Sequence, residues 1–130
     1  MLYVVDTHAL VWFLTQDARL GFNAQTVLSS PGPGNRLVVP TIVLAETWDL
    51  ARKLRVPVSF RYVLGQVRSS NALIHSLSVR VLTLLPNGLP DIHDAIVVAT
   101  AVALGSRRHP AAIVTRDRDI SNSGLAPCIW

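Results

Sequence analysis

The sequence predicts an α/β domain with a parallel β-sheet and helices on both faces of that sheet. Short apolar runs of strand type alternate along the chain with longer segments whose apolar residues recur at helical spacing. No linker, repeat or low-complexity tract interrupts the 130 residues. We therefore expect residues 1–130 to form a single domain around one core.

The first third of the chain predicts two strands and two helices. Residues 2–5, "LYVV", are a short apolar run typical of a buried strand. The apolar stretch that follows Asp6 predicts a helix, for which we expect Thr7 to be the N-cap. Residues 22–30 are compatible with a second helix, and the turn "PGPGN" separates them from a second strand at residues 36–41.

The middle of the chain predicts two further helices. Residues 42–55 have apolar side chains at helical intervals, and Pro57 ends that element. A second helix is expected over residues 59–70, with Ser59 at its start.

The last part of the chain contains segments of both strand and helix type. Residues 71–85 combine the alternation of a strand with the recurrence of a helix, and we expect a short strand near 72–75 followed by a helix capped by Ser78. A longer helix starts near Asp91 or Asp94 and stops at Gly105. A strand is expected at residues 111–115, and residues 125–130 predict an edge strand, because Pro127 lacks a backbone donor.

The charge is that of a basic protein. Lysine and arginine together number 12 against 8 acids, which gives a net charge of +4, and all the basic residues except Lys53 are arginines. The planar guanidinium suits phosphate recognition, because it binds two oxygens at once. An acidic protein partner would also satisfy such a surface, so the net charge alone does not choose between nucleic acid and protein.

The composition indicates a cytoplasmic protein. Half of the residues are hydrophobic, yet no run approaches the about 18–20 apolar residues that cross a membrane. Asp6 interrupts any signal-peptide core, and Cys128 has no second cysteine to pair with. A reducing compartment is therefore the expectation.

Carboxylates gather at the expected ends of strands. Asp6 ends the first strand, Asp117 follows the strand at 111–115, and Glu46 lies one turn into the helix after the second strand. Ligands of parallel sheets bind outside the carboxyl ends of the strands. The helix of Asp94 by itself is expected to begin at the opposite end or over a loop, so a long connection has to bring Asp94 to this rim.

Such a cluster predicts a metal site. Neighbouring carboxylates raise one another's pKa unless a cation separates them, and ligand sets made only of oxygen favour Mg²⁺ or Mn²⁺ over zinc. The sequence has no zinc-type spacing of His or Cys and no glycine-rich phosphate loop. With arginines nearby, this chemistry suits the hydrolysis of phosphodiesters.

Every one of these acids except Glu46, which is harder to dismiss, also has a plainer structural interpretation. Asp6 can be only a helix cap, Asp91 and Asp94 can only complement a helix dipole, and Asp117 can belong to an ordinary charged turn. We expect Asp49, with Arg52 and Lys53 within helical reach, to be a surface charge. The shared position of the other acids at strand ends is what favours a site.

Histidine and aromatic residues give weaker signals. His8 and His93 flank the proposed acids and can orient substrate or water, but a structural role is commoner for such residues. Trp12, Trp48 and Phe60 are expected to lie mostly in the core, with a dimer interface or a partner groove as alternatives.

Four segments of the chain together resemble the PIN-domain family, and within it the VapC-type toxins of bacterial toxin–antitoxin pairs. "VVDTHALVWFL" resembles the family's first motif, "PTIVLAETWDL" the second, "DIHDAIVVATAVALG" the third and "IVTRDRDI" the fourth. The motifs come in the family's order over residues 2–120. The acids that match the family's catalytic and metal-binding positions are Asp6, Glu46, Asp94 and Asp117.

The resemblance implies a five-stranded parallel sheet in an α/β/α sandwich and an endoribonuclease that depends on Mg²⁺ or Mn²⁺. Thr115, Asp119 and Asp91 match auxiliary positions, and Arg116 and Arg118 are the nearest candidates for binding the RNA backbone. A VapB-type antitoxin, whose tail covers the acidic pocket, is the implied partner. Family members commonly form homodimers.

Other functional classes remain open at this point. A PIN-domain nuclease of RNA processing that is not a toxin would share the four motifs, and a PIN-like binding module with little catalysis would share the fold. A receiver-like phosphotransfer module also gathers acids at strand ends. It usually needs a lysine at a late strand end, whereas Lys53 lies on a predicted helix.

Overall fold

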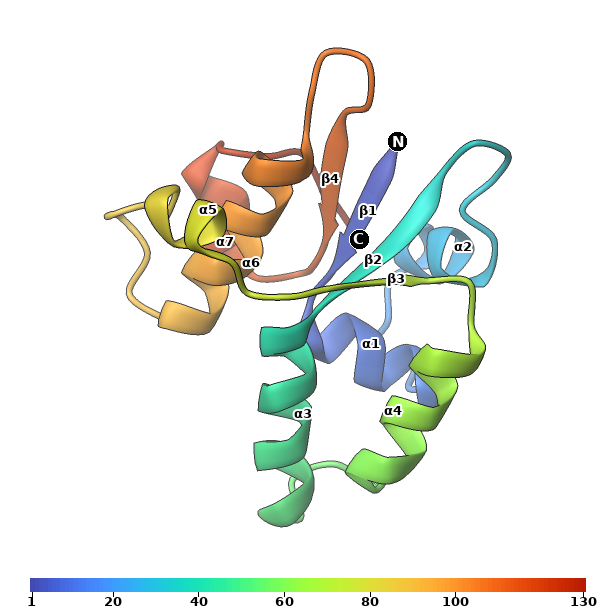
Figure 1. Ribbon diagram of the computed structural model, residues 1–130. Helices are drawn as coiled ribbons and strands as arrows, with labels where there is room; N and C mark the ends of the chain where they lie inside the picture. The colour runs from blue at the N-terminus through green and yellow to red at the C-terminus, as the bar shows by residue number, and fades with distance from the viewer.

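A five-stranded, entirely parallel sheet forms the centre of the protein, as a computed structural model of all 130 residues shows (Figure 1). The strands are β1 (Leu2–Val5), β2 (Arg36–Pro40), β3 (Leu73–His75), β4 (Ala111–Val114) and β5 (Cys128–Ile129). They lie in the order β3-β2-β1-β4-β5, so that the first strand is central and pairs with β2 and β4. The predicted parallel sheet is confirmed, with the segment before Trp130 as its edge strand.

Seven helices cover the sheet. They are α1 (Thr7–Leu14), α2 (Phe22–Ser29), α3 (Thr41–Arg52), α4 (Phe60–Ser69), α5 (Val79–Thr83), α6 (Ile92–Leu104) and α7 (Arg118–Ser123). In Figure 1, α5, α6 and α7 gather on one side of the sheet, and α1, α2 and α4 lie on the other. This is the α/β/α arrangement that the sequence predicts.

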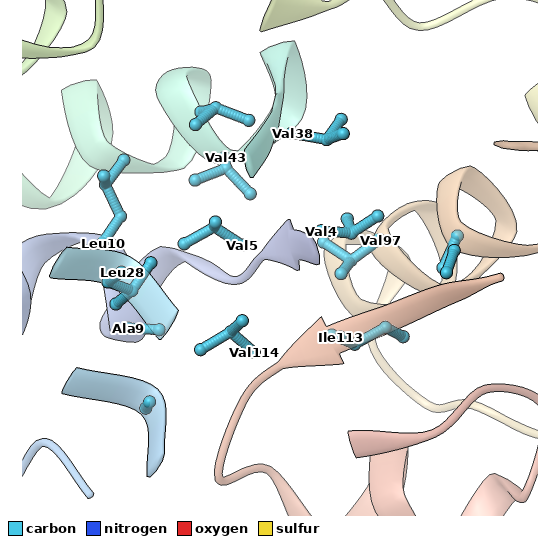
Figure 2. Packing of buried hydrophobic residues seen from close by; sticks show 14 of the residues in the cluster. Val4, Val5, Ala9, Leu10, Leu28, Val38, Val43, Val97, Ile113 and Val114 are labelled. Atoms are coloured by element: carbon cyan, nitrogen blue, oxygen red, sulfur yellow. The ribbon is translucent and has the colours of Figure 1, made fainter. Parts of the chain in front are cut away.

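The core follows from the alternation of side chains along the central strands. Val4 and Val5 are both fully buried because successive residues of a strand point to opposite faces. Val4 packs toward Val97 of α6, whereas Val5 packs toward Leu10 of α1 (Figure 2). A strand buried on both faces reads as a continuous apolar run, which is why these strands are recognisable in the sequence.

Several local predictions are confirmed. The ambiguous segment 71–85 does contain a short strand followed by a helix, and the Ser78 hydroxyl accepts a hydrogen bond from the Val81 amide. Ser59 caps α4 in the same way. Asp49 is a surface charge, paired with Arg52 and Lys53.

Two local predictions are wrong. The N-cap of α1 is Asp6 and not Thr7, which is the first residue of the helix. Helix α3 ends at Arg52, before the predicted 55, because Leu54 adopts a left-handed conformation with φ of 55°. The segment after β4, for which the sequence predicts no element, forms the short helix α7, with Asp117 as its N-cap and Gly124 as its C-cap.

The aromatic residues divide between core and surface. Trp12 is 7% exposed, and Phe60 packs partly against the core. Trp48 is 51% exposed and lies under the guanidinium of Arg52, so it is the exception to the expectation that most of these three residues lie in the core. No helix of the protein has both the length and the apolar character required to span a membrane.

Two glycines should respond in opposite ways to a methyl group. A Cβ on Gly21 would lie 2.6 Å from the backbone carbonyl carbon of Trp130, whose oxygen accepts a hydrogen bond from Asn23. We expect Gly21→Ala to lower the free energy of unfolding by about 1–3 kcal/mol through overpacking. Gly65 lies inside α4, and a Cβ added there would have no atom within 4 Å. Gly65→Ala should therefore raise the free energy of unfolding by about 0.5–1 kcal/mol.

Urea unfolding followed by circular dichroism measures both changes. If Gly21→Ala is as stable as the wild type, the packing of Trp130 on the start of α2 is not tight. Gly65→Ala then serves as the control for the intrinsic effect of replacing glycine by alanine.

Candidate active site

One cavity at the carboxyl ends of the strands contains all four acids that the sequence singles out. Its volume is about 550 Å³. The lining side chains are those of Asp6, His8, Trp12, Glu46, Asp91, Asp94, Arg116, Asp117 and Arg118. The acids come from four separate parts of the chain, so only the folded protein brings them together.

Asp6 is the most buried of these acids, with 9% of its surface exposed. One carboxylate oxygen accepts a hydrogen bond from the Thr7 amide at 2.7 Å, and the other accepts one from the Thr115 hydroxyl at 2.8 Å. Burial raises the pKa of Asp6, and the two hydrogen bonds oppose that rise because they favour the ionised form. The carboxylate is therefore buried but held in place by two donors.

Thr115 connects two of the acids. Its side chain is almost fully buried, and its hydroxyl oxygen accepts a hydrogen bond from the Asp117 amide at 3.0 Å while the hydroxyl donates to Asp6. Asp117 in turn caps α7, because its Oδ1 accepts the amides of Asp119 and Ile120 at 2.7 and 3.1 Å. The end of β4 is thus joined to the end of β1 through side chains as well as through the sheet.

Asp94 reaches the cavity from the first turn of α6. Asp91 caps that helix by accepting the amides of His93 and Asp94. The expectation that this helix starts away from the rim is wrong. A helix that connects parallel strands runs antiparallel to them, so α6 starts at the carboxyl edge and ends at the amino edge, where β4 begins.

Asp94 is the acid whose pKa is raised most clearly by the neighbouring carboxylates. Its pKa is raised to about 7, first by partial burial and then by the negative charges of Asp117, Asp6, Asp91 and Glu46. Each of these neighbours disfavours a further negative charge at this position. A cation among the acids would reverse this effect.

Glu46 lies in the second turn of α3 and contacts His93. The His93 Nδ1 lies 3.2 Å from Glu46 Oε2 and also 3.2 Å from Asp91 Oδ1, so this ring lies between α3 and α6. Burial raises the pKa of Glu46, the His93 side chain lowers it, and the charge of Asp6 raises it. The sequence favours a structural role for His93, with the orientation of substrate or water as the alternative. Its contact with Glu46 is a tertiary feature that local spacing does not reveal.

The remaining predicted residues are placed as follows. Arg116 and Arg118 line the cavity, and the Arg116 guanidinium lies 5.0 Å from the centre of the Trp12 ring. Asp119 does not line it, and its side chain borders a neighbouring hollow beside Leu89. His8 and Trp12 also line the cavity. In the sequence, their position two and six residues after Asp6 is the only indication that they lie near it.

The donor set consists of oxygen atoms, but it is not preassembled. No three His, Cys, Asp or Glu side chains of the chain are arranged as a ready metal-binding group. A cation among these acids would lower their mutual repulsion.

Because of Asp94, the stability of the metal-free protein should fall as the pH rises. Its pKa is about 7 in the folded protein and 3.8 without the fold, so the folded state holds the proton more tightly. The stabilisation is complete below about pH 4 and is lost as the pH rises through about 7. Asp6 and Glu46 contribute with the same sign.

Urea unfolding in EDTA across this pH range tests the expectation. Asp94→Asn should show a smaller loss of stability between pH 4 and pH 8 than the wild type, whereas Asp49→Asn, which removes a surface carboxylate, should keep the wild-type loss. Equal losses for all three proteins would contradict the proposed repulsion.

Three solved structures of other proteins are similar in fold to this chain. The chain is similar to a solved VapBC2 structure from Rickettsia felis bound to a promoter DNA fragment, with a TM-score of 0.73 and 16% identity over 100% of this chain and 99% of the other. It is also similar to VapBC-1 from nontypeable Haemophilus influenzae, with a TM-score of 0.67 and 16% identity over 99% and 97%. A third similar structure is Mycobacterium tuberculosis VapC20, a sarcin-ricin loop cleaving toxin, with a TM-score of 0.66 and 19% identity over 94% and 95%.

No curated protein sequence matches the chain with statistical support. The family model of the PIN domain, in contrast, matches residues 3–124, which include every acid of the cavity. The chain therefore belongs to the PIN-domain family.

Proposed function

We propose that this protein is an endoribonuclease that depends on Mg²⁺ or Mn²⁺ and acts as the toxin of a VapBC-type toxin–antitoxin pair. The observation that carries the proposal is the charge of the cavity. Its lining contains five acids and two arginines, which gives a formal net charge of −3 with every acid ionised and histidine neutral. A phosphodiester does not enter such a pocket unless cations bind first.

The residues present fit a hard divalent cation. Asp6, Glu46, Asp94 and Asp117 offer only carboxylate oxygens, which Mg²⁺ and Mn²⁺ prefer. We propose that these four hold one or two ions. When bound, the ion supplies positive charge to the phosphate and lowers the pKa of an attacking water.

The protein's own groups have separate roles in this proposal. Thr115 keeps the carboxylates of Asp6 and Asp117 in position through its two hydrogen bonds. Arg116 and Arg118, which have no acidic partner, bind the RNA backbone at the cavity rim. Hydrolysis by water leaves a 5′-phosphate and a 3′-hydroxyl, with no part for the neighbouring 2′-hydroxyl.

The toxin assignment is supported by the relatives in structure. The similar chains belong to VapBC assemblies or to a VapC toxin, and they match this chain over almost its whole length. We propose a VapB-type antitoxin as partner, with an arginine of its tail entering the acidic cavity, and a homodimer as the assembly. A PIN nuclease of RNA processing remains the alternative within the same chemistry.

RNA cleavage by the purified protein tests the chemistry. We expect total cellular RNA to be cut with Mg²⁺ or Mn²⁺ and left intact in EDTA. Asp6→Asn and Asp94→Asn should each reduce cleavage by at least about 100-fold, because each removes a charged ligand. Asp49→Asn is the matched control, since it removes one carboxylate from the helix of Glu46 without touching the cavity.

The chemical ends of the RNA products discriminate between hydrolysis by water and attack by the 2′-hydroxyl. End-labelling should detect 5′-phosphate termini. Cyclic 2′,3′-phosphate ends formed without metal would overturn the mechanism, equal cleavage by wild type and variants would identify a contaminant, and no cleavage by the folded, metal-loaded protein would favour a binding module.

Expression in a bacterial host tests the toxin assignment. We expect wild type to arrest growth, Asp94→Asn to be tolerated, and co-expression of a small open reading frame adjacent to the gene to restore growth. Cleavage in vitro without growth arrest would instead favour the RNA-processing nuclease.

A further inference from the structure

A second hollow adjoins the acidic cavity. It has a volume of about 280 Å³ and is lined by residues of α1, of the turn that follows α1, and of the end of α3 with the segment after it. His8 and Trp12 line both this hollow and the acidic cavity, so these two rings mark the boundary between the two. We call the second hollow the α1–α3 cleft; besides these rings, its lining includes Asp17, Arg19, Leu50 and Arg55.

The charge of the α1–α3 cleft is opposite to that of the acidic cavity. Arg19 is paired with Asp17 through two hydrogen bonds of 3.0 and 2.8 Å, so these charges cancel. The side chain of Arg55 has neither a hydrogen bond nor an ion pair and gives the cleft a net positive charge. The Arg55 guanidinium is therefore available in the cleft to bind an anionic group next to the acidic cavity.

The backbone holds Arg55 at this position. The Arg55 amide donates to the Leu50 carbonyl at 2.9 Å and the Leu54 amide to the Ala51 carbonyl at 3.0 Å, a helix-ending turn in which Leu54 is left-handed. A left-handed leucine costs about 1–2 kcal/mol, and glycine is the usual residue there. The turn directs the chain back against α1 and fixes where the Arg55 side chain starts.

The residues at the junction suit single-stranded RNA. His8 is exposed and its ring lies 5.4 Å from that of Trp12, which itself contacts the guanidiniums of Arg19 and Arg116 at 4.5 and 5.0 Å. Unpaired bases bind by stacking on aromatic rings, while arginines hold the backbone between them. Arg116 on one side of the junction and Arg55 on the other can therefore contact different phosphates of one strand.

We propose that the RNA strand on one side of the scissile phosphate leaves the acidic cavity over His8 and lies in the α1–α3 cleft. There His8 stacks on a base and Arg55 binds a backbone phosphate. The proposal rests on the proposed ribonuclease function and adds a substrate-binding subsite to it. A protein segment of the antitoxin is the competing occupant of this cleft.

RNA binding without cleavage is the first measurement. A fluorescein-labelled single-stranded RNA of mixed sequence is titrated with Asp94→Asn protein in Mg²⁺ at several salt concentrations. Adding Arg55→Ala should weaken binding about tenfold and reduce the slope of log K against log salt by about 1, as expected for one lost phosphate contact. Arg108→Ala is the matched control, because Arg108 is an exposed arginine in the loop before β4, at the opposite edge of the sheet.

The role of His8 has its own readout. His8→Ala should weaken RNA binding, and His8→Phe, which keeps a ring for stacking, should restore most of it. If Phe fails to rescue, or if Arg55→Ala behaves like Arg108→Ala while both remain folded by circular dichroism, the subsite proposal is wrong. Loss of affinity for the co-purified antitoxin alone would assign the cleft to protein and would equally overturn it.

Cleavage measured in parallel separates this proposal from the proposed function. If wild type cuts RNA and Arg55→Ala cuts it with an unchanged KM, the nuclease stands and the subsite fails. If wild type does not cut RNA at all with Mg²⁺ or Mn²⁺, the proposed function itself fails.

Discussion

One electrostatic constraint governs the site: carboxylates that repel one another lie together at a single rim of the sheet. Asp6 is buried, and Asp94 is crowded enough that its pKa reaches about 7. The fold tolerates this arrangement because backbone amides and a hydroxyl face several of the acids. The fold supplies these donors at fixed positions along the rim.

Helix capping and chemistry use the same residues here. Asp6, Asp91 and Asp117 each begin a helix, and each gives an oxygen to one or two amides of its first turn. Capping does not compete with a catalytic role, because a carboxylate has two oxygens and more acceptor sites than a cap requires. In Asp117 both capping bonds go to Oδ1. A structural role for these acids is therefore no argument against a role in the cavity.

The sequence predicts those features that follow from order along the chain. Strands buried on both faces give continuous apolar runs, and the carboxyl ends of parallel strands share one rim, so Asp6 and Asp117 could be placed together. Features that depend on packing between helices could not be predicted. The contact of His93 with Glu46 and the exposure of Trp48 depend on how α3 lies against its neighbours. Helix α7 has six residues, which is too short for a periodic signal.

The distribution of charge separates binding from catalysis. The chain has a net charge of +4, and the cavity lining accounts for −3 of it, so the remaining residues carry +7. This basic surface attracts a polyanion at long range, whereas the acidic cavity repels the phosphate that has to be cut. A divalent cation bound among the acids would act mainly on the second of these effects. Under the proposed function, association with RNA should therefore depend mainly on arginines and salt, whereas entry of the scissile phosphate should depend on the metal.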